Sequence, residues 1–251
     1  MKSCGVYDGV VPRNYIVAAT PRTGSSLLCE GLCATGIAGN PAEVFAPDFR
    51  HMWYRHWGLP SGTTFKQYVS TAIGKGRTDN GVFALKIQWM HVALLAHELT
   101  MRGEDCDVLE RLFPESQFIN VVRRDRLAQA LSWHRAIVTN VWWKFQAGKD
   151  SSNGCEATLD TSAVDALVEE IVRQQSAWEN YFRKSKRRVL VVEYESLDKD
   201  YRGEVARALQ FLGLDASAAR RIPEPRLMRQ ADSLNVQWRR QMHRARKEMQ
   251  R

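Results

Sequence analysis

The sequence predicts one α/β domain, with a mostly parallel β-sheet flanked by helices. Three observations support this class. Short apolar runs alternate with segments of helical periodicity, which is the pattern of repeated βαβ units. No internal repeat interrupts the alternation, and a length of 251 residues suits one large α/β domain. We therefore expect a single domain over residues 1–251, with its core at about 15–240 and a basic helical tail.

The first half of the chain predicts two strand–helix pairs. The run YIVAA, at 15–19, is typical of a buried strand, and SLLCEGLCAT, at 26–35, of the helix that follows it. Gly36 is the expected stop of that helix, because glycine tolerates the left-handed backbone of a helix end. GVFALKIQW, at 81–89, predicts a second strand, and HVALLAHELTMRG, at 91–103, a second helix.

A third pair follows in the middle of the chain. SQFINVVRR, at 116–124, predicts a strand, and the long pattern that continues through 125–143 predicts a helix. The segment GKDSSNGCEATLD, at 148–160, is polar and rich in Gly and Ser, so we expect a loop or a lid there.

The last part of the chain predicts a long helix and one more strand–helix pair. Residues 162–188 carry apolar side chains on one helical face. VLVVEYESL, at 189–197, predicts a strand, and 201–214 a helix that Gly213 stops. Open parallel sheets bind ligands at the carboxyl ends of their strands, so the site is expected in the turns that follow the strands.

Composition restricts the partners. The net charge of +8 favours an anionic partner, which includes phosphorylated small molecules, nucleic acid and membrane surfaces. Five irregularly spaced cysteines form no zinc-type set, and reduced thiols of a cytoplasmic protein are the simplest interpretation. No apolar run is long enough for a signal peptide or a transmembrane helix. We expect neither a metal site nor a membrane span.

The first turn, TPRTGSS, has the properties of an anion-binding loop. It joins a strand to a helix N-terminus, whose amides and dipole attract negative charge. Gly24 permits close backbone approach, Arg22 adds a cation, and the hydroxyls belong to Thr23, Ser25 and Ser26. The loop lacks the G-K-[ST] of a Walker A sequence, so a magnesium nucleotide is not indicated. An ordinary turn with a surface arginine is the alternative for this motif taken alone.

A second motif makes the pattern more specific. Arg124 stands at the end of an expected strand, and Ser132 follows eight residues later on the next helix. Together with the P-R-T-G-S-S loop, this pair resembles the sulfotransferases that use 3'-phosphoadenosine 5'-phosphosulfate (PAPS). The resemblance implies a P-loop-like fold, a first loop that cradles the 5'-phosphosulfate, and an Arg–Ser clamp on the 3'-phosphate.

Longer stretches narrow the resemblance to the bacterial trehalose 2-sulfotransferase family. They are LLCEGLCATGIAGNPAEVF, GRTDNGVFALKIQW, QALSWHRAIVTNVW and RQADSLNVQWRRQ, spread over roughly residues 15–240. The family implies PAPS as the sulfo donor, 3',5'-bisphosphoadenosine as the product, no metal, and a homodimer. The stretch GNPAEVF matches the family's G-x-P-x-E-F-F, whose glutamate is the general base, and this implies that role for Glu43.

Lys86 is the second catalytic candidate. Many sulfotransferases carry K-T-H with a basic His; the corresponding LKIQ here has Lys86, but Gln88 occupies the His position. His91, the nearest other histidine, lies beyond an apolar turn. Lys86 is interpreted either as an edge-strand lysine that discourages aggregation or as a cation on the transferring sulfo group. Without the family, Glu43 would be interpreted as a solvated loop carboxylate.

The acceptor side departs from the family. Pro21 stands where the family is expected to carry Gln, and Asn40, Ala42 and Val44 replace an expected Glu, Gln and Phe. Because a sugar site depends on its polar partners, the acceptor is left open among trehalose, another carbohydrate, a glycolipid and a natural-product hydroxyl. The expected acceptor-side residues are Pro21, Gly39, Asn40, Pro41, Ala42, Val44, Phe45 and Trp53.

Other aromatic and basic residues have two interpretations each. Trp133, Trp142 and Trp143 belong to the core by default, and an acceptor pocket is the alternative. In the basic tail, Arg229 either lies on a solvated helix face or closes over the 3'-phosphate, because arginine is the usual planar phosphate clamp.

Two other classes of function remain open at the level of sequence. A P-loop kinase would require magnesium, and the missing G-K-[ST] argues against it. A nucleic-acid-binding protein would explain the basic charge and would show salt-sensitive binding, but no stacking platform is interleaved with the basic residues. We expect no nucleic-acid partner.

Overall fold

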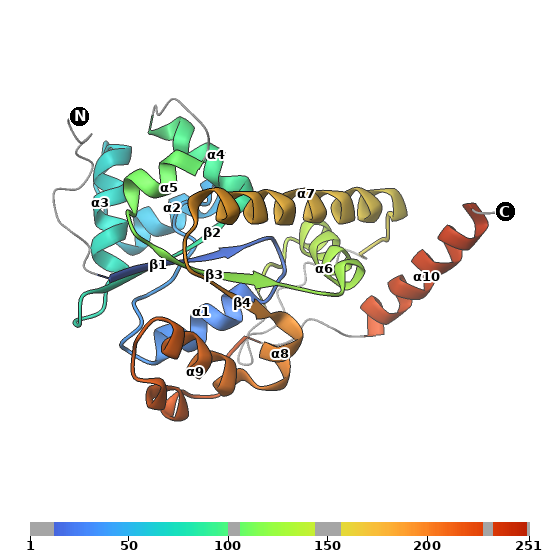
Figure 1. Ribbon diagram of the computed structural model, residues 1–251. Coiled ribbons are helices and arrows are strands. Elements are labelled where there is room, and N and C mark those ends of the chain that lie inside the picture. Colours follow the sequence, from blue (N-terminus) through green and yellow to red (C-terminus); the bar gives the residue numbers. More distant parts are fainter. Residues whose placement is uncertain (1–12, 100–105, 144–156, 228–232, 250–251) are drawn as a thin grey trace.

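Four parallel strands form the sheet at the centre of the molecule, in the order β2–β1–β3–β4 (Figure 1). The computed structural model describes residues 13–99, 106–143, 157–227 and 233–249. The strands are β1 (Arg13–Ala19), β2 (Val82–Gln88), β3 (Gln117–Val122) and β4 (Val189–Glu193). The predicted α/β class with a parallel sheet flanked by helices is confirmed.

The register of the strands brings their carboxyl ends to one edge of the sheet. The central strand β1 pairs with β2, where Ala19 lies opposite Gln88, and with β3, where Ala19 lies opposite Val121. β4 continues the sheet beyond β3, with Val122 opposite Glu193. The turns after β1, β2, β3 and β4 therefore lie close together, as the topology of a parallel sheet requires.

Helices cover both faces of the sheet (Figure 1). Successive side chains of β1 alternate between two cores: Ile16 and Ala18 pack with one set of helices, and Tyr15 and Val17 with the other. The first set is α2 (Pro47–His56), α3 (Phe65–Lys75), α4 (Trp89–Glu98), α5 (Cys106–Leu112) and α7 (Thr161–Ser185). The second is α1 (Ser25–Ala34), α8 (Tyr194–Lys199), α9 (Tyr201–Phe211) and the 3-10 helix η1 (Ala216–Arg221).

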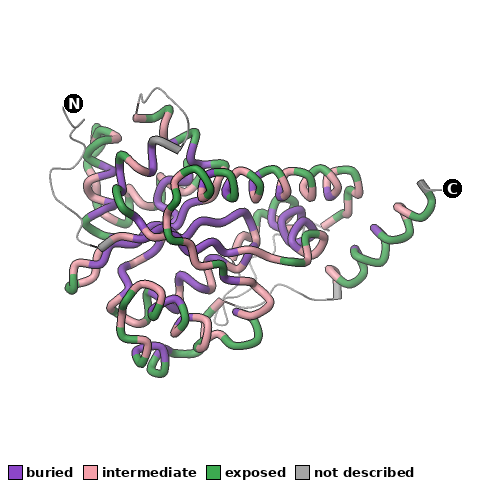
Figure 2. The backbone as a smooth tube through the Cα atoms, in the orientation of Figure 1, coloured by how far each residue is buried: buried purple, intermediate pink, exposed green. Residues whose placement is uncertain are grey.

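Burial follows this layering (Figure 2). β1 and β2 are covered on both faces, and their apolar runs are continuous for that reason. A third core joins α6 (Arg126–Thr139), α7 and the tail helix α10 (Ser233–Met249), and it includes the buried side chains of Trp133, Trp238 and Met242. None of the described helices is long and apolar enough to cross a membrane.

The structure corrects two predicted elements. The strand expected at 189–197 ends at Glu193, because pairing with β3 stops there, and α8 begins at Tyr194. α8 turns Leu197 into the core beneath the sheet. The helix expected at 125–143 ends at Thr139, where Asn140 adopts a left-handed backbone with φ 53°. Most of the polar segment 148–160 lies outside the described residues, and so does Arg229.

Candidate active site

The loop between β1 and α1 is held rigidly at the carboxyl edge of the sheet. Gly24 caps α1 with φ 80°, and Arg22 also has a left-handed backbone, with φ 64°. From α6, the fully buried Gln129 donates through Nε2 to Pro21 O at 2.7 Å and to Thr20 Oγ1 at 2.9 Å. The helix N-terminus and the side chain of Arg22 therefore sit in a fixed, positively polarised turn.

Gly24 is required not only for its positive φ but also for its close approach to Tyr194, so the effect of adding one methyl group can be predicted. A Cβ at Gly24 would lie 2.5 Å from Cδ2 of Tyr194, whereas a Cβ at Gly36, also with positive φ, would meet nothing within 4 Å. Gly36→Ala should cost about 1–2 kcal/mol from backbone strain alone. Gly24→Ala should lower the free energy of unfolding further, measured by urea denaturation. Equal losses for the two variants would show that the Tyr194 contact imposes no constraint.

A cavity of about 500 Å³ opens beside this loop. Of the predicted donor-site residues, Arg22, Gly24, Ser25, Ser26 and Ser132 line it, as do the catalytic candidates Glu43 and Lys86. Thr23 does not line it; its Oγ1 donates to Thr20 O at 3.1 Å and shapes the loop from within. The structure thus brings together, in one cavity, residues from β1–α1, β2 and α6 that lie far apart in the sequence.

Arg22 is positioned by α6 and by the segment that follows it. Its Nε donates to Ser132 Oγ at 3.1 Å, and its Nη1 donates to the carbonyl of Trp142. Burial, with a contribution from the neighbouring Arg123, lowers the pKa of Arg22 to about 10. Arg22 therefore remains charged at neutral pH and faces the cavity in a place where an anion would be strongly favoured.

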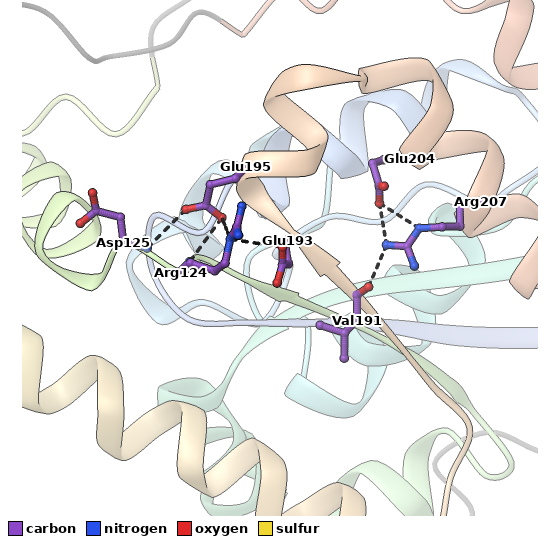
Figure 3. A network of polar contacts seen from close by, with 7 residues as sticks. All are labelled: Arg124, Asp125, Val191, Glu193, Glu195, Glu204 and Arg207. Carbon is purple, nitrogen blue, oxygen red and sulfur yellow. Dashed lines mark hydrogen bonds and ion pairs between the residues drawn. The ribbon is translucent and has the colours of Figure 1, made fainter.

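The two adjacent arginines after β3 have different environments. The side chain of Arg124 is 66% exposed and pairs with Glu193 and Glu195, at 3.3 and 3.7 Å from its Nε (Figure 3), and it does not line the cavity. Arg123 does line it, and its guanidinium lies 4.4 Å from the ring centroid of Tyr194. Of the two, Arg123 is the one brought close to the loop, with Nη1 3.5 Å from Arg22 O. That Arg124 binds the 3'-phosphate of the donor stays a prediction.

A buried charged cluster joins the loop to β2 and α4. Lys86 Nζ lies 2.7 Å from Glu43 Oε2 and donates to Ser26 Oγ at 3.0 Å. On the other side of the carboxylate, His91 Nδ1 lies 3.4 Å from Glu43 Oε1. The side chains of Glu43, Lys86 and His91 are at most 9% exposed. β2 is an edge strand of the sheet, but Lys86 is buried there and paired with Glu43 instead of facing solvent, so the anti-aggregation interpretation does not apply.

Glu43 is ionised in this cluster. Burial raises the pKa of its carboxyl group, but the attraction of Lys86 and hydrogen bonding with His91 and Lys86 outweigh burial and lower it to about 2. The interpretation of Glu43 as a solvated loop carboxylate is wrong, because its side chain is buried. Lys86 N donates to Ala42 O at 3.1 Å, and this contact holds the loop that carries Glu43 against β2.

Of the predicted acceptor-side residues, the structure places one in the cavity lining and the others outside it. Pro21 lines the cavity. Val44 and Phe45 are buried in the core, Trp53 packs against it, and Asn40 ties the loop to the end of α3 by donating to Lys75 O and Arg77 O. Gly39, Pro41 and Ala42 also lie outside the cavity lining. Any role of these residues in acceptor binding stays a prediction, and the observed contacts of most of them position the chain around Glu43.

Several cavity residues were not assigned to the site from the sequence, or, like Trp133, Trp142 and Trp143, were given an acceptor pocket only as the alternative to the core. Trp142 and Trp143 line the cavity beside Phe49, with Trp143 and Phe49 ring centroids 4.9 Å apart, and Trp133 and Met90 also line it. His91, Arg123 and Tyr194 are further examples of lining residues. The Arg-Arg pair and the histidine after LKIQWM were visible signals, whereas nothing local to Tyr194 indicated that it would meet Gly24. Within the described ranges, no three His, Cys, Asp or Glu side chains form a metal-ligand group.

Comparison with known proteins assigns the class and then the family. The chain superimposes on the sulfotransferase domain of the olefin synthase of Synechococcus PCC 7002 with a TM-score of 0.52 and 19% identity, covering 94% of this chain and 86% of that one. The P-loop-like α/β fold of a sulfotransferase is thereby confirmed. Residues 14–246 match the family described as Stf0 sulphotransferase, and the chain belongs to this family.

The relatives agree with this assignment. The chain is 30% identical to a trehalose 2-sulfotransferase of Mycobacterium tuberculosis, over 90% of this chain and 92% of the relative. It is 29% identical to the trehalose 2-sulfotransferase of Mycolicibacterium smegmatis, over 90% and 93%. The resemblance read from the sequence is confirmed, the protein is a sulfotransferase, and a kinase is no longer the competing interpretation.

Proposed function

We propose that this protein transfers the sulfo group of PAPS to a hydroxyl of a carbohydrate-type acceptor, with Glu43 as the general base. The observation that carries the proposal is the bridge made by Lys86, whose Nζ contacts both Ser26 of the anion loop and the Glu43 carboxylate. One cation is thus shared between the loop that would hold the donor and the group that would take the acceptor's proton.

The donor side of the cavity fits a nucleotide with phosphate and sulfate groups. The N-terminus of α1, Arg22, Lys86 and Arg123 supply positive charge, and Ser26 and Ser132 supply hydroxyl donors. PAPS supplies a sulfo group on a good leaving group. The charge-assisted contacts of Arg22 and Lys86 would be worth most where charge develops during transfer, since burial removes much of the water around both side chains.

The acceptor side joins Glu43 to polar and aromatic groups. In the proposed reaction an S–O bond forms to the acceptor oxygen as the bond to the leaving phosphate breaks, and the hydroxyl proton passes to Glu43. Gln88 lines the cavity, and its buried Oε1 has no hydrogen-bond partner among the described residues, so it is available to accept from a second hydroxyl. Trp142, Trp143 and Phe49 offer flat apolar surface to a sugar ring. Trehalose, the substrate named for the mycobacterial relatives, is the first acceptor to test.

Calorimetric titration with 3',5'-bisphosphoadenosine and with 5'-AMP, both in EDTA, tests the donor half of the proposal. The bisphosphate should bind at least tenfold more tightly, because a charge-assisted contact contributes about 1.5–3 kcal/mol and only the bisphosphate has the 3'-phosphate. Equal affinities would contradict a 3'-phosphate site, and a requirement for magnesium would contradict the proposed metal-free binding of the donor.

Arg123 and Arg124 provide a matched pair for locating the 3'-phosphate contact. Arg123→Ala should weaken the bisphosphate by at least tenfold more than it weakens 5'-AMP, because Arg123 lines the cavity with Ser132. Arg124→Ala should have a smaller effect if its pairs with Glu193 and Glu195 persist in the complex. The reverse order would show that Arg124 leaves these pairs when the nucleotide binds and would support the assignment made from the eight-residue spacing.

A further inference from the structure

His91 is the one member of the buried cluster to which the proposed reaction gives no role. It lies in the first turn of α4, is 7% exposed, and lines the cavity next to Glu43. Its Nδ1 faces Glu43 Oε1 at 3.4 Å, while Lys86 Nζ faces Oε2 at 2.7 Å. The carboxylate is therefore contacted on both oxygens, by cationic or hydrogen-bonding groups from two different elements.

The charges around Glu43 determine what His91 can do there. Lys86 comes from β2 and His91 from α4, while the titratable group on the α1 side is Cys29, whose pKa burial raises to about 12, so that this thiol is neutral. An ionised carboxylate opposite Nδ1 favours the histidine tautomer with its proton on Nδ1, since the alternative would place two lone pairs face to face. His91 is thus a hydrogen-bond donor to Glu43 whether or not its ring is charged.

The ammonium group of Lys86 is shared between Glu43 and the anion loop. Its Nζ also donates to Ser26 Oγ in the anion loop, so an anion bound there competes with Glu43 for the same ammonium group. Without a second partner, a carboxylate buried to this degree would become harder to ionise as Lys86 turned toward the anion, and it would lose its orientation.

We propose that His91 is a positioning residue, which holds Glu43 ionised and oriented through its Nδ1–H while the charge of Lys86 is shared with the bound sulfo donor. This inference rests on the proposed function, because it assigns His91 a task in the step in which Glu43 accepts the acceptor's proton. Neither Glu43 Oε1 nor His91 Nδ1 has another hydrogen-bond partner among the described residues, so at 3.4 Å each atom is available to the other.

The pH dependence of turnover distinguishes this role from a merely structural one. Glu43 must be ionised to accept a proton, so kcat falls as pH falls through the pKa of Glu43 in the donor complex. Removing the Nδ1–H donor raises that pKa. The acid limb of the kcat profile should therefore move to higher pH by about one unit, since hydrogen bonding to a carboxylate lowers its pKa by that order.

The test uses three variants of His91 and one control on the same helix. His91→Leu and His91→Gln should show the shifted limb, whereas His91→Asn, whose Nδ2 lies near the place of Nδ1, should restore it. His97→Leu, on the exposed side of α4, should match the wild type. The readout is transfer of the labelled sulfo group from saturating PAPS, measured as inorganic sulfate with water as the acceptor and as the sulfated sugar with trehalose. An unshifted limb in His91→Leu would overturn the proposal.

A second measurement needs no acceptor. Nitrogen-15 NMR of histidine-labelled protein, with the His91 signal assigned from its loss in His91→Asn, should show a protonated Nδ1 in the wild type. A neutral ring with a bare Nδ1 would overturn the proposal. The two proposals can fail separately: a wild type that neither binds 3',5'-bisphosphoadenosine nor turns over PAPS would refute the proposed function, whereas a fully active His91→Leu with an unshifted limb would refute only the role of His91.

Discussion

Glu43→Gln is expected to lower kcat by about 10²–10⁴-fold, which is the usual contribution of a general base. Glutamine keeps the size of the side chain and can still accept a hydrogen bond, but it cannot take up a proton at neutral pH. The affinity for 3',5'-bisphosphoadenosine should stay within a few-fold of the wild type, because the contact of Glu43 with the loop seen in the described residues is indirect, through Lys86. Steady-state kinetics with labelled PAPS, together with calorimetry, checks both expectations.

Glu98→Gln is a suitable control for this substitution. Glu98 is an exposed carboxylate at the end of α4 that pairs with Arg50, and its replacement should leave kcat unchanged. A rise in acceptor KM at constant kcat for Glu43→Gln would show that Glu43 orients the hydroxyl without taking its proton. Wild-type values of both constants would remove Glu43 from the reaction altogether.

Lys86→Met should damage both the fold and the reaction. It leaves the buried Glu43 carboxylate without its closest cation, and breaking a buried ion pair from one side costs about 3–5 kcal/mol. Turnover should fall by about 10²–10³-fold, because a charge that stabilises the transferring group is lost. Denaturant unfolding and PAPS turnover measure the two effects independently.

The pH dependence and a double variant identify the cause of this instability. With Lys86 gone, the pKa of Glu43 in the folded protein should rise above its unfolded value, so the folded state binds the proton more tightly. The destabilisation should then be smaller at pH 5 than at pH 7. Adding Glu43→Gln to Lys86→Met should recover most of the lost stability and none of the activity. An equally unstable double variant would place the cause in packing rather than in unpaired charge.

Much of the sheet was predictable because its strands are buried on both faces. A strand such as 15–19 then appears as an uninterrupted apolar run, which is easily recognised. The start of α8 could not be predicted, because Tyr194 and Leu197 continue an apolar pattern past the last residue of β4 that pairs with β3, Glu193. α3 had a readable signal that was missed: Thr64 and Gln67 form a capping box at its N-terminus.

The candidate site was predictable where one local segment carries the chemistry. The loop from Arg22 to Ser26 indicates a candidate anion site, because it combines a glycine, a cation and the N-terminus of the following helix. Which of Arg123 and Arg124 lines the cavity could not be predicted. Adjacent residues at the end of a strand point to opposite sides, and the fold determines which side faces the cavity. The contact of His91 with Glu43 depends on how α4 meets a loop almost fifty residues earlier, and no local pattern encodes it.

Transfer of a radiolabelled sulfo group from PAPS to a hydroxyl acceptor, measured in EDTA, tests the central claim most directly. The wild type should move the label to trehalose or to another carbohydrate in the presence of chelator, and Glu43→Gln should do so about 10²–10⁴-fold more slowly. The claim would be contradicted if the label stayed on the donor with every acceptor and with water, or if Glu43→Gln transferred it at the wild-type rate.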